Sequence, residues 1–192
     1  MNESESSTGF GRFAAMVATS TVVMFGLMYL NTYAIGHIQY SQTRTWMAIV
    51  MGATMAIIML AFMWSMYSGR KLKAAIILGS AVTFAVALWL VRSQETVGEV
   101  SYMKAMIPHH SIAILTSERA HIKDPEVRKL ADGIIDAQVR EIVQMKRLIA
   151  RLEANPSSAD APDLLSYRAR GVPPPSPETD QSSGIDTLQV DR

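Results

Sequence analysis

Residues 103–114 read MKAMIPHHSIAI and residues 134–145 read IIDAQVREIVQM. Both segments carry apolar residues three and four positions apart, which is typical of amphipathic helices. Between them, Asp124 can cap a helix, Pro125 suits its first position and Glu126 places an acid in its first turn. The connection between the two patterns is very short. The sequence therefore predicts an antiparallel helical hairpin over residues 92–153.

Each predicted helix carries polar side chains within its apolar stripe. The first stripe comprises Met103, Ile107, His110, Ile114, Ser117 and His121, and the second comprises Val127, Ala131, Ile134, Gln138, Glu141, Met145, Leu148 and Leu152. Folding the hairpin about residue 123 places His110 opposite residues 136–138. The same fold places Met106 opposite Glu141, and Met103 opposite Met145. The register therefore predicts one facing cluster of Met103, Met106, His109, His110, Gln138, Glu141 and Met145.

The predicted cluster has the chemistry of a metal site. Thioether sulfur selects Cu(I), and imidazole binds either oxidation state of copper, so the two methionine-bearing segments favour copper over zinc. The alternative interpretation is structural. Met103 and Met145 are then core residues, and Gln138 and Glu141 bond to each other or to the histidines. His121 lies three turns from His110, so we expect it at a helix end. Pro108 either kinks the first helix or begins a new one.

The N-terminal half contains three apolar runs, at residues 13–35, 46–67 and 72–91; the first two carry no charge, and the third carries only Lys73, which is close enough to its end to reach the interface. A bilayer core of ~30 Å needs about 20 helical residues, so each run is long enough to cross it. Aromatic side chains lie near the predicted boundaries, as interfacial aromatics do: Trp46, Trp64, Tyr67 and Trp89. The methionines of the second run stand four apart and spiral around the helix, so we assign them to packing. The sequence predicts a three-span membrane domain over residues 13–91.

The basic residues predict the orientation of the spans. Arg12 precedes the first run and Arg70 and Lys71 lie between the second and third, whereas the first connection holds only Arg44. The positive-inside rule then places the N-terminus in the cytoplasm and the hairpin domain outside, which in a bacterium means beyond the inner membrane, in the periplasm or the exterior. We expect loose tails over residues 1–12 and 154–192. The second tail is rich in proline and serine and predicts disorder.

Composition excludes several classes of function. The chain of 192 residues has no cysteine, which rules out disulfides, thiolate metal sites and cysteine nucleophiles. A formal net charge of +1 gives no reason to expect nucleic acid as a partner. Di-iron enzymes built on helical bundles need several inward glutamates, and the predicted stripes offer only Glu141. We therefore expect no enzyme.

The segments MIPHHSIAI, DPEVRKLADGII and AQVREIVQM closely resemble the bacterial family known as domain of unknown function 305. This resemblance covers about residues 99–153. It implies a ferritin-like helical bundle and copper binding in the periplasm, with Met106, His109, His110, Gln138, Glu141 and Met145 at family positions. The family often has an acid near the start of the first helix and a methionine after its Ala-Ile pair. Here those places read Val100–Tyr102 and Leu115–Ser117, which leaves a gap in the implied site.

The predicted fold is all-α: three transmembrane helices, a helical hairpin that supplies half of a four-helix bundle, and a disordered tail. A hairpin buries only one face, so we expect a homo-oligomer. The expected function is membrane-anchored binding, buffering or handover of copper. The alternative is a structural module whose hairpin docks a partner without metal.

Overall fold

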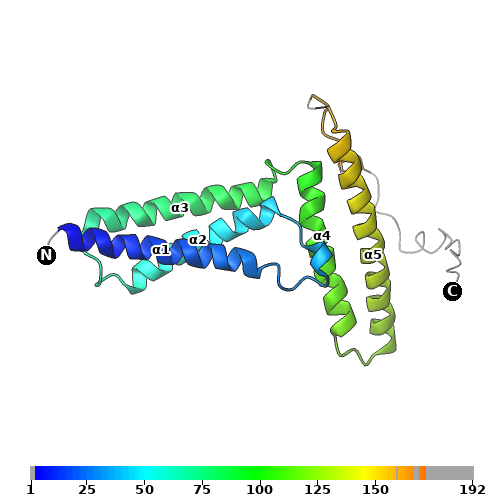
Figure 1. The fold of residues 1–192 in the computed structure, drawn as a ribbon, viewed down its shortest axis with the longest axis horizontal. Coiled ribbons are helices and arrows are strands. Elements are labelled where there is room, and N and C mark those ends of the chain that lie inside the picture. The colour runs from blue at the N-terminus through cyan, green and yellow to red at the C-terminus, as the bar shows by residue number, and fades with distance from the viewer. Residues whose placement is uncertain (1–2, 159, 167–168, 172–192) are drawn as a thin grey trace, which may run out of the picture. The chain divides into compact units, whose positions relative to one another are not determined.

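The computed structural model describes residues 3–158, 160–166 and 169–171. The chain divides into two units, Met1–Pro156 and Ser157–Arg192. The described part of the first unit is helical, which confirms the all-α prediction (Figure 1). Its elements are α1 (Glu3–Leu27), the short 3-10 helix η1 (Ile35–His37), α2 (Gln42–Phe62), α3 (Arg70–Ser93), α4 (Glu99–Arg119) and α5 (Pro125–Ala154).

Three helices are long and apolar enough to cross a membrane: Gly9–Leu27 within α1, Gln42–Phe62 and Arg70–Ser93. This confirms the predicted number of spans but corrects the bounds of the first. Residues 3–11 were expected to be loose, yet they belong to α1. The helix also ends at Leu27, well before Ile35, because the chain turns after it, with Tyr29 N donating to the Gly26 carbonyl at 3.1 Å. The absence of charge indicates that a segment tolerates an apolar environment, but it does not require the whole segment to be helical.

Helix α2 packs against both α1 and α3 (Figure 1). Its buried positions are mostly small, including Ala48, Ala53 and Ala56, which allows neighbouring helices to approach closely. At Gly52 a Cβ atom would collide with the Thr21 side chain of α1. Outside this contact the spans expose large apolar side chains, as a lipid-facing surface requires; examples are Val22, Ile58, Leu78 and Val86.

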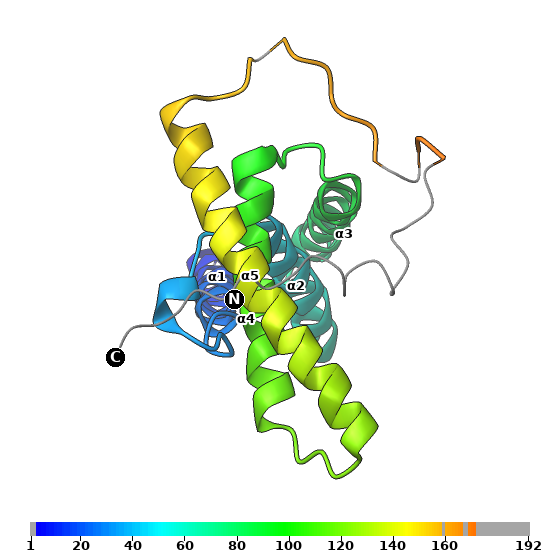
Figure 2. The same cartoon turned by 90° about the vertical axis from the view of Figure 1, so that its right-hand side faces the viewer.

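Helices α4 and α5 form the predicted antiparallel hairpin (Figures 1 and 2). The buried core between them consists of Met103, Ile107, Ile114, Ile142, Met145 and Ile149. The predicted helix start is confirmed, because the Asp124 carboxylate accepts from the backbone N–H groups of Glu126 and Val127 at 2.9 and 3.0 Å. Pro108 lies inside α4, so it does not begin a new helix. His121 lies beyond the end of α4 and is exposed.

The buried face of α5 differs from the predicted stripe. The sequence predicts Val127 and Ile134 on the inner face, but they are 49% and 36% exposed. The core instead takes Ile142 and Ile149, with Ile135 packed against it, while Ala131 is buried as predicted. Helix α5 is apolar on two adjoining faces, and only packing against α4 selects between them. Of the predicted disordered tail, residues 172–192 lie outside the described residues.

Candidate metal-binding site

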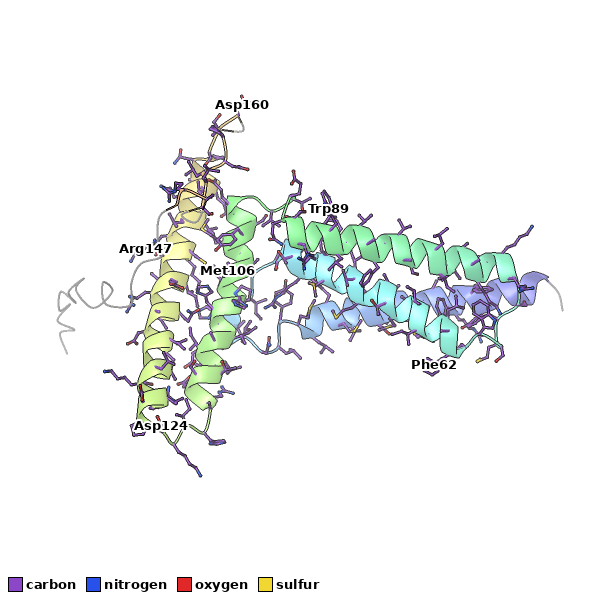
Figure 3. All side chains as sticks on the ribbon, turned by 180° about the vertical axis from the view of Figure 1, so that it is seen from behind. Phe62, Trp89, Met106, Asp124, Arg147 and Asp160 are labelled. Atoms are coloured by element: carbon purple, nitrogen blue, oxygen red, sulfur yellow. The ribbon has the colours of Figure 1, made fainter. Side chains whose placement is uncertain are left out.

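A cavity of about 540 Å³ opens between the first half of α4 and the second half of α5. Five of the seven predicted ligands line it. Met106 projects from α4 towards α5 at this level (Figure 3). The lining residues are Glu99, Tyr102, Met103, Met106 and His110 from α4, and Glu141, Gln144, Met145, Leu148, Arg151 and Leu152 from α5.

His110 and Glu141 face each other across this cavity. The His110 Nδ1 atom lies 3.0 Å from Glu141 Oε2, and the two side chains are 14% and 50% exposed. The pair is close enough for an ionic contact but lacks the alignment of a hydrogen bond, so the buried Nδ1 has no hydrogen-bond partner. A buried ring nitrogen without a partner is costly in a packed interface. It is also a free position for a ligand.

Burial sets the protonation of His110. Desolvation lowers the pKa of its imidazole, the Glu141 carboxylate partly opposes this shift, and His109 adds slightly to it. A lowered pKa keeps the ring neutral at neutral pH, and the neutral ring is the form that binds metal ions. The environment of His110 therefore suits a metal ligand.

Two predicted ligands do not line the cavity. His109 is exposed, and its ring centroid lies 6.2 Å from that of His110. Gln138 is partly buried but outside the lining. Its predicted place opposite His110 is taken by Glu141, almost one turn further along α5. The predicted register counts residues equally in both directions from one turning residue, which assumes that the two helices end level with each other. The connection over residues 120–124 is not helical, so the helices need not be level.

The sequence interpretation missed Glu99, which lies in the first turn of α4 and lines the cavity. Glu99 is an acid near the helix start, where the resemblance to the family leaves a gap. The predicted helix began at Val100 and so excluded Glu99. Its spacing gave a usable signal, because residues 99, 103, 106 and 110 recur at four, three and four positions. Leu115 and Ser117 lie outside the lining, so the expected gap there is outside this cavity.

The donor set is mixed. Three thioethers, one imidazole and two carboxylates reach the cavity wall, a combination that suits copper better than hard ions. Among the described residues, no three His, Cys, Asp or Glu side chains gather in a metal-ligand cluster. Glu118 and His121 have the Glu-x-x-His spacing of di-iron sites. His121 lies beyond the end of α4, however, so the two do not share one helical face.

Comparison with known proteins agrees with the resemblance seen in the motifs. Residues 99–188 match the family described as "Domain of unknown function (DUF305)". The C-terminal half of the chain resembles this family. A relative from Acanthamoeba polyphaga mimivirus, "Uncharacterized protein L153", is 27% identical over 142 residues, which cover 70% of this chain and 91% of that protein. No solved structure matches the chain.

Proposed function

We propose that this chain is a membrane-anchored copper-binding protein that buffers copper or hands it to another carrier. The single observation that carries the proposal is the His110 ring nitrogen, buried without a hydrogen-bond partner in a cavity. Met103, Met106 and Met145 line the same cavity and supply soft donors. Glu141, at 3.0 Å from the ring, supplies an anionic oxygen.

The donors at this site would suit different oxidation states of copper. Thioethers hold Cu(I) in compartments where thiolates would oxidise, and imidazole with carboxylate accommodates Cu(II). Bound copper would supply a soft cation that can be passed between thioether and imidazole donors. The cavity is open on one side, and Glu141 is half exposed at its mouth. An open site of mixed donors suits exchange with a second carrier more than permanent storage.

The proposed location is the inner membrane of a bacterium, with the N-terminus in the cytoplasm and the hairpin in the periplasm or outside the cell. Arg12, Arg70 and Lys71 support this orientation by the positive-inside rule. Arg44, the one Lys or Arg between the first two apolar runs, lies in the first turn of α2. Its Nη1 donates to the Met28 carbonyl at 2.6 Å, and its guanidinium lies 4.4 Å from the Tyr29 ring centroid. Its charge therefore weighs little against the assignment.

The test is copper titration of the full chain in lipid nanodiscs, with His110→Ala compared with His109→Ala. The two histidines are neighbours in sequence, but only His110 lines the cavity. Loss of groups that merely orient a metal ligand costs about 10–100-fold in affinity. We therefore expect His110→Ala to lower copper affinity at least about tenfold and His109→Ala to change it little. Failure of the unaltered protein to bind micromolar copper would overturn the proposal.

A second candidate is an interaction module in which the hairpin docks a protein and the histidines are incidental. It is favoured by an exposed apolar row on α5, at Val127, Leu130 and Ile134, where Leu130 is 65% exposed. Their spacing of three and four puts them on one side of the helix. A second copy of the hairpin would cover such a row and complete a four-helix bundle. Mass measurement of the intact protein and of Leu130→Glu tests this, because a dimer held by the row should dissociate.

A further inference from the structure

Ser111 joins α4 to a distant part of the chain. Its side chain is fully buried. Its Oγ accepts the backbone N–H of Tyr33 at 2.8 Å and lies 3.0 Å from His37 Nδ1. Tyr33 and His37 belong to the connection between α1 and α2, residues 28–41, which we call the strap. One hydroxyl thus holds two points of the strap.

The strap has further electrostatic interactions with the hairpin. A hydrogen bond to Glu118 of α4 is the main cause that raises the pKa of the Tyr33 hydroxyl. Burial lowers the pKa of His37, and the charge of Lys146 on α5 lowers it further. The strap therefore lies against α4, which η1 contacts, and His37 is near enough to α5 to be affected by the charge of Lys146.

The ends of the strap are tied to the membrane helices. Near its start, the Met28 carbonyl accepts from Arg44 of α2 at 2.6 Å. At its end, the Ser41 N–H donates to the Tyr29 hydroxyl at 3.1 Å, and the Ser41 side chain caps α2 by accepting from Arg44 N at 3.2 Å. These hydrogen bonds join the two ends of the strap to each other and to the start of α2. A displacement of α4 at Ser111 is thus resisted by α1 and α2.

His110 and Ser111 are consecutive residues of α4, and successive side chains on a helix point about 100° apart. His110 therefore turns to the cavity while Ser111 turns to the strap. A metal ion held by His110 together with Glu141 and Met145 would fix the same turn of α4 that Ser111 fixes against the strap. Attachment at Ser111 therefore positions His110 for the metal, and the bound metal in turn holds Ser111 against Tyr33 and His37.

We propose that attachment of the strap at Ser111 and occupancy of the cavity by a soft metal ion are coupled. Ser111 is then a positioning residue that acts on the metal through His110, and this coupling rests on the proposed function. Each event favours the other by the same factor, because binding linkage is reciprocal. Metal binding in the hairpin thereby strengthens attachment of the strap, whose ends are bonded to the membrane helices.

The strap is tested in the full chain in nanodiscs, which has no native cysteine. Ile35→Cys in the strap and Lys129→Cys on α5 are both exposed positions outside the cavity, and each takes a nitroxide label. Without metal, the two labels should give one narrow distance distribution. Ser111→Ala should broaden this distribution, while the matched Ser117→Ala, on the same helix, should leave it narrow. Equal distributions in all three proteins would overturn attachment at Ser111.

The coupling is tested with silver(I), a diamagnetic soft ion that stands in for Cu(I) and leaves the nitroxides readable. Typical coupling between two sites changes affinity by about 5–150-fold. Ser111→Ala should therefore weaken silver binding at least about fivefold, although every cavity donor is intact. By reciprocity, silver should narrow the distance distribution of Ser111→Ala. Unchanged affinity in Ser111→Ala, or an unchanged distribution with silver bound, would overturn the coupling.

A second variant protects the test if Ser111→Ala folds poorly. His37 lies in the connection outside the helical core, so His37→Ala removes one strap contact without a core substitution. It should weaken silver binding in the same direction, and His37→Asn, whose side-chain amide can occupy the place of Nδ1, should restore it. If neither silver nor copper binds the unaltered protein, the proposed function and the coupling both fail. If metal binds but does not narrow the label distribution of Ser111→Ala, only the coupling fails.

Discussion

The two faces of α4 bury polar groups in opposite ways. On the strap face, the fully buried Ser111 hydroxyl has Tyr33 N and His37 Nδ1 within 3.0 Å. On the cavity face, the His110 Nδ1 atom is buried without a hydrogen-bond partner. A satisfied buried group holds a structure together, whereas an unsatisfied one beside a cavity is a candidate ligand. Of these two adjacent residues, Ser111 therefore has a structural role and His110 is the candidate metal ligand.

Ile107 belongs to the core that supports both faces of α4. Its truncation should give the largest change in the free energy of unfolding. It is fully buried in the core shared by α4 and α5. Truncation of such a side chain removes buried surface and leaves a void, which costs about 2–5 kcal/mol for Ile→Ala. Ile107→Ala should lower the free energy of unfolding by that amount, measured by denaturant unfolding of the full chain. Val139→Ala, at an exposed position of α5 outside the apolar row, is the control and should change stability much less.

Ser111→Ala should come next, and its cost should come from the partner left behind. Without the hydroxyl, the Tyr33 N–H loses its acceptor at 2.8 Å. A fully buried donor without a partner costs about 1–3 kcal/mol, and because Tyr33 is part-exposed this is the upper bound here. Hydrogen exchange at the Tyr33 amide should accelerate, and the free energy of unfolding should fall by no more than that amount. Equal exchange in Ser111→Ala and Ser117→Ala would show that the two faces do not differ in this way.

His110→Leu should behave in the opposite manner. The substitution removes a buried ring nitrogen that has no hydrogen-bond partner, and it leaves Glu141, which is half exposed and can be hydrated. Replacing an unsatisfied buried polar group with an apolar one of similar shape is nearly neutral or stabilising. We expect a change below about 1 kcal/mol in the free energy of unfolding, together with loss of copper binding. A large destabilisation would mean that His110 is a structural residue, as Ser111 is.

The sequence predicted the helices better than it predicted their contacts. Local signals such as the cap at Asp124 and the uncharged runs depend on neighbouring residues, so the hairpin and the spans could be predicted. The pairing of His110 with Glu141 depends on the axial register of α4 against α5, which no local sequence pattern determines. Residue spacing could have found Glu99. Nothing in the spacing connects Ser111 with His37, because 74 residues separate them.

The smallest expected effect is a pH dependence to which both faces contribute. Burial lowers the pKa of His110 and of His37 below the ordinary value of 6.5. Between each lowered pKa and 6.5, the unfolded chain binds more protons than the folded chain, so stability falls as the pH drops through that window. Above 6.5 both states are neutral and the contribution vanishes. The midpoint of thermal unfolding, followed from pH 8 to pH 5, should decline on the acid side. His110→Leu and His37→Asn should each flatten part of that decline, and their combination should flatten more than either. If only His37→Asn has an effect, then the His110 ring is not desolvated in the folded protein, and the contrast between the two faces of α4 fails.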